Sequence, residues 1–415
     1  MKINRQPPDI AELKNLMRFE RPHLDRRAAR LDKAADIYDL RAIAKRRTPK
    51  AAFDYVDGAA MREVSLAETR EAFTKARLLP RMLSGAVEVD TSVDIAGGTS
   101  ALPFGIAPTG FTRFMHAEGE DAGAAAARDA GIPFALSTMG TRSVEETAKV
   151  SGRGRRWFQL YLWKDRAASL DLVQRAWDAG YDALIVTVDT PVAGQRLRDT
   201  RNGMRIPPRL TAGTVVDAAW RPEWWFNFLT TEPVTFASLT STTGTLGELV
   251  NGMFDPSLNY GDLAWIREQW PGTLIVKGIV NPADARTAYE LGADAIQVSS
   301  HGGRQLDQVV NPLQALEKIR AELGADADII YDSGIMSGND IVIALALGAD
   351  FVMVGRAYLY GLMAGGREGV DKAIELLAGQ VSNTLQLLGC SSVADLKRSH
   401  VIAPWDGDKN VGGHA

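Results

Sequence analysis

From about residue 102 onward, short apolar runs rich in Val, Ile and Phe alternate with Ala-rich stretches whose apolar residues recur at helical spacing. Three junctions, at residues 179–186, 291–298 and 347–354, look alike. Each has a glycine near the end of a helical stretch, then a short loop and a buried apolar run. Because glycine is the usual residue at a helix C-terminus, these junctions predict repeated helix-to-strand units and therefore a parallel sheet.

The same pattern predicts eight strands. They are expected at residues 104–108, 134–137, 157–161, 184–189, 274–277, 295–299, 329–332 and 351–355. Six of the seven intervals suit one crossover helix, whereas the interval after the fourth strand must hold a long excursion, roughly residues 197–259. Eight parallel strands favour an α/β fold of the TIM (β/α)8 barrel type over an open doubly wound sheet.

Around the predicted barrel, residues 101–400, we expect an N-terminal helical extension, residues 1–100, and a C-terminal tail, residues 401–415. The first fifty residues hold 14 Lys and Arg against 7 Asp and Glu. We interpret them as a pair of solvated helices at residues 9–19 and 24–45. Contact with an anionic membrane surface or an acidic partner is the alternative.

The composition is that of a globular protein. Of the 415 residues 46% are hydrophobic and 24% are charged, and the formal net charge is −4, which excludes a disordered, collagen-like or coiled-coil chain. No basic patch predicts a nucleic-acid partner. The single cysteine, Cys390, cannot form an internal disulfide, and neither a signal peptide nor a long apolar run is visible. We therefore expect a cytoplasmic protein.

The excursion contains a dense group of aromatic residues. Within nine positions it holds Trp220, Trp224, Trp225, Phe226 and Phe228. One interpretation is a lid or subunit-contact segment that buries these side chains. The other is a patch for a membrane interface, where Trp and Tyr are enriched, and it would make the protein peripheral on the inner face of the cell membrane.

Polar residues gather at the carboxyl ends of the predicted strands, which form the active face of such barrels. They are Thr109, Ser137, Gln159, Tyr161, Thr187, Asp189, Lys277, Ser299, His301, Asp332, Gly355 and Arg356. Because burying an unpaired charge costs several kcal/mol, Lys and Asp at these positions predict a functional site.

His301 follows a buried strand and precedes two glycines, a setting in which it can act as a general base near neutral pH. Asp189 would orient this imidazole and stabilise its protonated form, although a loop-capping role is the alternative. Lys277 would form a Schiff base or present a fixed positive charge, and the sequence does not separate these two roles.

Two arginines, Arg196 and Arg304, are predicted at the same mouth and suit a carboxylate ligand. For Arg196, an ordinary ion pair with Asp199 is the alternative. Gly355 and Arg356 end the eighth strand before a helix, which predicts a phosphate-bearing cofactor. The sequence has no Walker loop, no convincing G-x-G-x-x-G and no paired ligands for zinc, so neither ATP, Rossmann-bound NAD nor a metal is expected.

The stretch S-x-H-G-G-R-Q-L-D at residues 299–307 resembles the active-site signature of the FMN-dependent L-2-hydroxy-acid-oxidising family, which includes glycolate oxidase, lactate oxidase, L-lactate dehydrogenase and mandelate dehydrogenase. The resemblance runs from about Ile37 to His400. It also covers residues 53–55, 108–110, 158–161 and 276–278. Residues 198–204 and 228–233, with the Trp-rich run, look most like the bacterial L-lactate dehydrogenase branch.

The resemblance implies FMN as cofactor and oxidation of an L-2-hydroxy acid, expected to be L-lactate to pyruvate. The implied catalytic residues are His301, Asp189, Tyr161 and Lys277. The implied substrate-binding residues are Tyr55, Arg196, Arg304, Tyr161, Gly110 and Met139. The implied FMN-binding residues are Pro108, Thr109, Gly110, Ser137, Gln159, Thr187, Lys277, Ser299, Asp332, Gly334, Gly355 and Arg356.

The sequence departs from the family's pattern at two places. Met336 stands where many members have an arginine that helps to bind the phosphate, so Arg356 and backbone amides must carry more of that role. Ser300 replaces the usual Asn. Gly110 leaves room for a side chain larger than methyl, so a larger acid such as mandelate, or glycolate, is an alternative substrate.

Two further alternatives are a flavin barrel that catalyses another reaction and a non-catalytic FMN-binding assembly protein. The expected partners are the hydroxy acid, an electron acceptor (a quinone, another carrier or oxygen), and further copies of the chain in a homo-oligomer, with a homotetramer as the family's common state.

Overall fold

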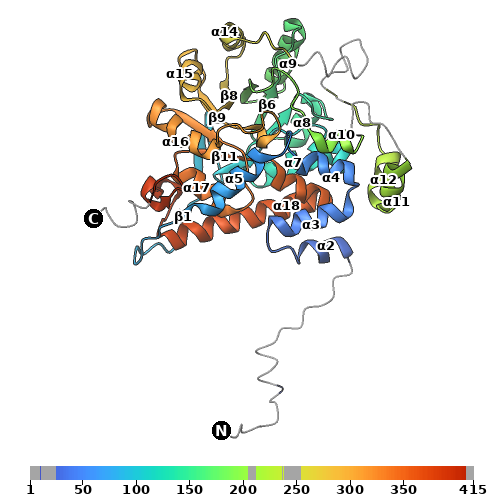
Figure 1. The fold of residues 1–415 in the computed structure, drawn as a ribbon, viewed down its shortest axis with the longest axis horizontal. Coiled ribbons are helices and arrows are strands. Elements are labelled where there is room, and N and C mark those ends of the chain that lie inside the picture. Colours follow the sequence, from blue (N-terminus) through green and yellow to red (C-terminus); the bar gives the residue numbers. More distant parts are fainter. Residues whose placement is uncertain (1–9, 11–24, 204–211, 236, 238–253, 408–415) are drawn as a thin grey trace.

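Eight parallel strands close into a barrel in a computed structural model that describes residues 10, 25–203, 212–235, 237 and 254–407, and the predicted fold is thereby confirmed (Figure 1). The strand order around the barrel is β10-β11-β4-β5-β6-β7-β8-β9. The strands are β4 (Phe104–Ile106), β5 (Phe134–Ser137), β6 (Arg156–Leu160), β7 (Ala183–Thr187), β8 (Thr273–Ile279), β9 (Ala295–Val298), β10 (Asp328–Tyr331) and β11 (Phe351–Val354).

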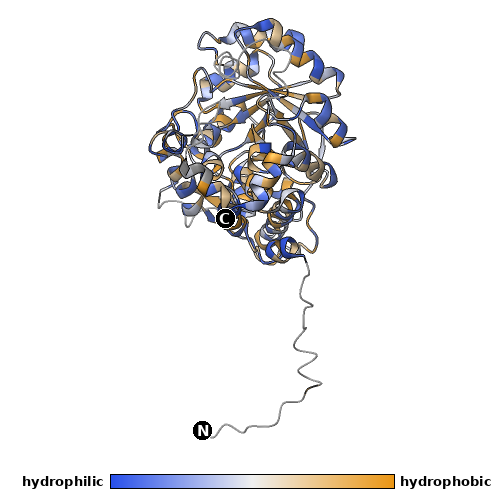
Figure 2. Ribbon diagram, turned by 90° about the vertical axis from the view of Figure 1, so that its right-hand side faces the viewer, coloured by the Kyte–Doolittle hydropathy of each residue, from blue (hydrophilic) through white to orange (hydrophobic). Residues whose placement is uncertain are grey.

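Helices connect successive strands and surround the barrel, so the orange apolar strands lie inside a ring of helices with blue outer faces (Figure 2). These helices are α6 (Thr112–Met115), α7 (Gly119–Asp129), α8 (Val144–Ser151), α9 (Arg166–Asp178), α14 (Tyr260–Gln269), α15 (Pro282–Glu290), α16 (Pro312–Leu323), α17 (Gly338–Ala346) and α18 (Arg356–Leu388). The three predicted junction glycines, Gly180, Gly292 and Gly348, follow α9, α15 and α17 with positive φ, as helix C-terminal glycines do.

Most strand boundaries differ from the prediction by one or two residues. Strand β4 ends before Pro108, which has no amide hydrogen for a ladder bond, and β7 ends two residues before Asp189, which therefore lies in the following loop. Strand β8 runs on to Ile279 through an irregularity in its pairing with β9 between Lys277 and Ile279.

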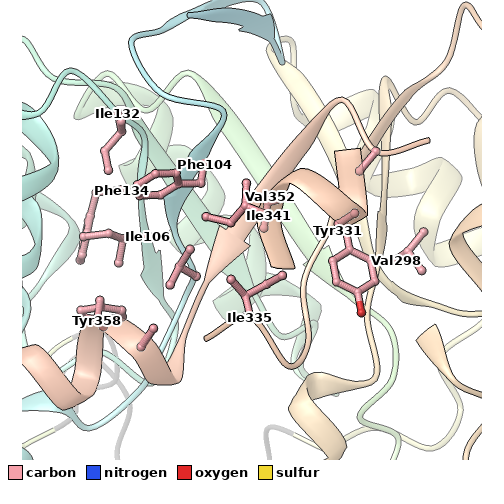
Figure 3. Packing of buried hydrophobic residues seen from close by; sticks show 14 of the residues in the cluster. Phe104, Ile106, Ile132, Phe134, Val298, Tyr331, Ile335, Ile341, Val352 and Tyr358 are labelled. Carbon is pink, nitrogen blue, oxygen red and sulfur yellow. The ribbon is translucent and has the colours of Figure 1, made fainter. Parts of the chain in front are cut away.

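The barrel interior is a packed core whose lower end is closed by a hairpin of β2 (Val93–Ile95) and β3 (Gly98–Ser100). The Arg155 guanidinium donates hydrogen bonds to three carbonyls of this hairpin. A second core lies between strands and helices, and Figure 3 shows part of it, with Phe104, Ile106, Phe134 and Val352 packed near Ile341 and Tyr358. Because the lower end is filled, a ligand can enter only at the carboxyl ends of the strands.

The prediction of one solvated helix at residues 24–45 is wrong. The structure has two helices, α2 (Arg26–Leu31) and α3 (Ile37–Arg47), because the Asp36 side chain accepts a hydrogen bond from the Asp39 amide and starts a new helix. Ile37, Leu40 and Ala44 are buried, and α3 lies along α18 (Figure 1). The helix predicted at residues 9–19 lies outside the described residues.

The rest of the N-terminal region comprises α4 (Lys50–Asp57), α5 (Val64–Lys75) and β1 (Arg77–Leu78). Strand β1 pairs with β12 (Val401–Ile402), so the first residues of the predicted C-terminal tail are held in a two-stranded sheet. The division of the chain into an extension, a barrel and a tail stays a prediction.

The excursion carries α10 (Leu197–Arg201), α11 (Ala212–Ala219) and α12 (Pro222–Thr230), which precede α14. Trp224 packs edge-on against Phe114, and its indole nitrogen donates a hydrogen bond of 3.0 Å to the carbonyl of that residue. Trp220 and Phe226 point outward, with 80% and 58% of their surface exposed. The expectation that the segment buries its aromatics thus holds for Trp224 and not for these two residues in the single chain.

Candidate active site

A cavity of about 380 Å³ opens at the carboxyl ends of the barrel strands. Residues that follow the strands line it, together with α4, α5 and the loop that leads into α10. This volume lies within the range of small-molecule sites, about 300 to 1,000 Å³. The N-terminal region therefore forms part of the wall of the pocket.

His301 lies in a tight turn after β9 and lines this cavity. Its backbone has φ 55°, and Gly302 and Gly303 also have positive φ. A non-glycine residue in this conformation is strained, and such strain is common at functional sites. His301 Nδ1 lies 3.1 Å from Asp189 Oδ1. Since this contact places the ring proton on Nδ1, the lone pair of Nε2 is available as a base.

Asp189 and Lys277 set the charge around His301. Burial, together with the Lys277 ammonium 3.5 Å from Nδ1, lowers the pKa of His301 against the opposing effect of Asp189. Burial alone would raise the pKa of Asp189, but His301 and Lys277 outweigh it and hold the pKa below its ordinary value. The arrangement keeps the imidazole neutral and the carboxylate charged at neutral pH, as a general base requires.

Arg196 and Arg304 line the cavity next to Tyr55, with their guanidinium carbons 5.7 Å and 4.8 Å from the centre of its ring. Arg304 donates to the Tyr55 carbonyl, and burial together with the charge of Arg196 lowers its pKa to about 10. Arg196 Nε donates to Asp199 Oδ2 at 2.9 Å, so the predicted ion pair is present. That bond uses the Nε atom of Arg196. Two guanidinium groups at the mouth of the same cavity suit a carboxylate ligand.

Tyr161 and Met139 complete this side of the cavity. Burial and the nearby Asp189 raise the pKa of the Tyr161 phenol, which stays protonated and can donate a hydrogen bond. A Cβ atom added to Gly110 would overlap the Cβ of Met139. The sequence predicted free space beside Gly110. In the structure, Met139 occupies the position that a Cβ atom of residue 110 would take.

Polar side chains below the cavity form two hydrogen-bonded groups. Ser137 donates to Gln159, which donates to Thr187, across β5, β6 and β7. Asp332 accepts hydrogen bonds from Ser299 and from Gln297 Nε2. The Oε1 atom of Gln297 is buried and has no partner among the described residues.

At the other end of the cavity, Gly355 precedes α18 and no side chain caps the helix. The first amides of a helix lack intrahelical partners and attract anions. Arg356 also lines the cavity, as do Gly334 and Met336 from the loop after β10, and Arg70 from α5. The end is therefore cationic and suits a phosphate group.

Most predicted site residues line the one cavity. These are Tyr55, Pro108, Thr109, Gly110, Ser137, Met139, Tyr161, Arg196, Lys277, His301, Arg304, Asp332, Gly334, Gly355 and Arg356. Four do not: Asp189 lies behind His301, Ser299 lies below Asp332, and Gln159 and Thr187 are buried in the hydrogen-bonded chain from Ser137.

Three further residues at the site were not predicted from the sequence: Gln297, Arg70 and Tyr358. The Tyr358 hydroxyl forms a hydrogen bond with that of Thr109. Gln297 is the one polar residue in the apolar run of β9, and this signal could have identified it. Among the residues that the structure describes, no group of three or more His, Cys, Asp and Glu is placed to hold a metal ion.

Comparison with known proteins identifies the family of the chain. Residues 44–403 match the family model described as FMN-dependent dehydrogenase. A Mycobacterium tuberculosis protein that is provisionally named L-lactate dehydrogenase is 53% identical over 401 residues, which cover 97% of each chain. The L-lactate dehydrogenase of Xanthobacter autotrophicus is 39% identical over 372 residues, 88% of this chain and 95% of the relative.

Among solved structures, the crystal structure of the monotopic membrane protein (S)-mandelate dehydrogenase aligns with a TM-score of 0.85 at 35% identity. The alignment covers 89% of this chain and 99% of that one.

Proposed function

Because this chain belongs to the FMN-dependent dehydrogenase family and is an oxidoreductase that uses FMN to oxidise 2-hydroxy acids, we propose that its substrate is L-lactate, which it converts to pyruvate. The relatives named L-lactate dehydrogenase support this proposal. The observation that carries it is that the Met139 side chain lines the cavity beside Gly110, which favours a substrate with a short side chain.

The pocket suits FMN by its donor set. Lys277 provides a positive charge beside His301, and the unpaired Oε1 of Gln297 provides a hydrogen-bond acceptor. Thr109 provides a hydroxyl. The uncapped start of α18 and Arg356 face the other end, where a Cβ added to Gly355 would meet no atom closer than 3.9 Å. When bound here, FMN supplies a two-electron acceptor for the substrate. Ser137, which Gln159 and Thr187 hold from behind, would bond its polar edge, and Asp332 and Gly334 its ribityl chain.

Arg196, Arg304 and Tyr55 would hold the substrate carboxylate. The two guanidiniums present planar donors, and a hydrogen bond to a charged group contributes about 1.5 to 3 kcal/mol. Tyr161, which stays protonated, would donate to the hydroxyl or carboxylate of the substrate. These contacts would fix the reacting carbon beside His301.

His301 would take a proton from the 2-hydroxy acid at Nε2, since Nδ1 faces Asp189. Asp189 would act as a positioning residue that fixes the tautomer and stabilises the imidazolium formed. Lys277 would provide a fixed positive charge next to the developing negative charge, the second of the two roles that the sequence left open.

A larger acid, (S)-mandelate, is the second candidate, and the fold similarity to (S)-mandelate dehydrogenase favours it. The discriminating experiment compares kcat/KM for L-lactate, glycolate and (S)-mandelate with an artificial electron acceptor. L-lactate should be used best. A preference for (S)-mandelate would refute L-lactate as the substrate and leave the oxidation of 2-hydroxy acids intact.

The variant Met139→Ala tests the carrying observation. Met139→Ala removes the thioether from the lining of the cavity and makes room for a larger substrate side chain, so kcat/KM for (S)-mandelate relative to L-lactate should rise by about tenfold. An unchanged ratio would show that Met139 does not limit the size of the substrate.

Three finer properties are also proposed. The proposed location is the cytoplasmic face of the membrane, which Trp220, Phe226 and Leu229 of the excursion would contact. The exposure of these side chains supports the proposal, as does the similarity to the monotopic membrane protein (S)-mandelate dehydrogenase. No described helix has the length and apolarity to cross a bilayer. A quinone is the proposed acceptor, and oxygen is the alternative that flavin reoxidation assays would reveal.

We also propose a homotetramer. The loop after β1 exposes Met82, Leu83 and Val87, an apolar surface that a second copy would cover. Light scattering of the purified protein tests this state, and a monomeric mass would refute it.

A further inference from the structure

We propose that Arg70, on helix α5 of the N-terminal region, is a second arginine that binds the phosphate of FMN. The inference depends on FMN as the cofactor and not on which hydroxy acid is oxidised. It starts from the lining of the cavity, which includes Gly334, Met336, Gly355, Arg356 and Arg70, and from the hydrogen bond that Arg70 donates to the Gly334 carbonyl.

Among these residues, the barrel loops alone provide one guanidinium. Arg356 Nε donates to the Val56 carbonyl at 2.9 Å, and its Nη2 donates to the Gly58 carbonyl at 2.8 Å. These bonds leave Nη1 as its nitrogen without a backbone partner among the described residues. Met336, from the loop after β10, contributes an apolar side chain and no charge.

A phosphate monoester carries a charge of about −1.5 to −2 at pH 7. One guanidinium and the amides at the start of α18 leave part of this charge uncompensated. A second cation near the phosphate would therefore strengthen binding. Arg70 lines the cavity from helix α5 and contacts Gly334 in the loop after β10.

Arg70 is held in place with donors to spare. Its Nη1 donates to Asp340 Oδ2 at 2.7 Å and to the Gly334 carbonyl. Asp340 is itself buried and accepts a hydrogen bond of 2.8 Å from the Met336 amide. The Nε atom of Arg70 is buried and has no partner among the residues that the structure describes.

The ion pair with Asp340 uses Nη1 of Arg70, while Nη2 makes no hydrogen bond to the described residues and the side chain keeps 21% of its surface exposed. A guanidinium that is fixed by a carboxylate and still has free donors is pre-organised for an anion, because little side-chain freedom is lost on binding. Phe73 adds to this fixation, since the guanidinium carbon lies 5.5 Å from its ring centre.

The test compares two ligands that differ by the phosphate. The full chain is stripped of flavin and titrated with FMN and, separately, with riboflavin, and binding is followed by quenching of flavin fluorescence. In Arg70→Gln the affinity for FMN should fall by about 10- to 100-fold, as expected for loss of a charge-assisted hydrogen bond, while the affinity for riboflavin should change less than about twofold.

Two further variants keep the test decisive. Arg70→Lys keeps the charge and the ion pair with Asp340 but loses the planar donors, so it should give a smaller loss that is again specific to FMN. It also replaces Arg70→Gln if that variant does not fold. Arg77→Gln is the matched control. Among the described residues, Arg77 donates only to the nearby carbonyls of Thr74 and Ala76, so this variant should bind both ligands normally.

Equal losses for FMN and riboflavin would make Arg70 a structural residue and overturn the proposal, as would unchanged FMN affinity in both variants. No hydroxy acid takes part in the titration. Failure of the proposal that L-lactate is the substrate would therefore leave this result unaffected.

Discussion

The mouth of the barrel and the excursion between β7 and β8 differ in how firmly the fold holds them. At the mouth, His301 is bonded to Asp189, and Gln305 from the same turn donates to the carbonyls of Asp189 and Val192. In the excursion, α12 is tied to the barrel mainly through Trp224 and through Glu223, which pairs with Arg47. Trp225 and Phe226 are exposed, whereas Phe228 stacks on Trp224 and packs edge-on against Phe114.

The difference indicates a division of labour. Side chains at the ends of barrel strands are fixed by neighbouring strands, so chemistry that needs accurate geometry belongs there. The excursion presents a surface whose composition can serve a membrane or a partner without disturbing that geometry. If this division holds, substitutions at the mouth must affect turnover, and substitutions in α12 must not.

The largest effect is expected for His301→Gln. Glutamine keeps polarity but cannot accept the substrate proton near neutral pH, so turnover should fall by about 10²- to 10⁴-fold or more. FMN content should stay normal, because His301 lies at the chemical end of the cavity. His400→Gln, a change at a buried histidine outside the cavity, is the control. Near-normal turnover in His301→Gln would remove this residue from its role.

The second prediction concerns pH. Since burial and Lys277 lower the pKa of His301, the neutral form that accepts a proton is populated above that pKa, and kcat/KM should rise with pH to a plateau reached by neutral pH. Asp189 opposes this lowering, so Asp189→Asn should move the rising limb to still lower pH. Turnover should fall as well, by about 10²-fold, because the imidazolium loses its partner. A limb that stays in place or moves to higher pH would contradict Asp189 as the positioning residue.

A smaller effect is expected for Arg304→Lys. Lysine keeps the charge but not the planar pair of donors, so kcat/KM for L-lactate should fall by about 10- to 100-fold. Lactamide, which lacks the carboxylate charge, separates the causes. The variant and the parent should use lactamide almost equally poorly. If the variant lost lactate and lactamide activity to the same extent, Arg304 would not be a carboxylate ligand.

The smallest effect on turnover is expected in α12. Replacing both Trp220 and Phe226 by Ser removes exposed apolar surface, so co-sedimentation with anionic lipid vesicles should fall while kcat stays within about twofold, as for most surface changes. Val216→Ser, in the neighbouring helix α11, is the control for an exposed apolar residue outside the aromatic group. Unchanged vesicle binding would refute the membrane contact, and lost turnover would break the division between the two regions.

The same division explains what the sequence could predict. Barrel topology brings the carboxyl ends of all eight strands to one face, so the sequence alone places Lys277, His301 and Asp332 together. The packing of α3 on α18 depends on contacts between residues some 300 positions apart, and local polarity at residues 24–45 concealed it. Arg70 escaped notice because an arginine on an amphipathic helix is typical of a solvated face, and only the tertiary structure brings it to Gly334.

The most direct test of the central claim is flavin reduction in a single turnover. The yellow holoenzyme is mixed with L-lactate in the absence of oxygen and of any other acceptor, and the visible flavin absorbance is followed. The arrangement of His301 with Arg196 and Arg304 predicts rapid bleaching with L-lactate and none with the D-isomer. A flavin that stays oxidised with L-lactate and with every other L-2-hydroxy acid would contradict it.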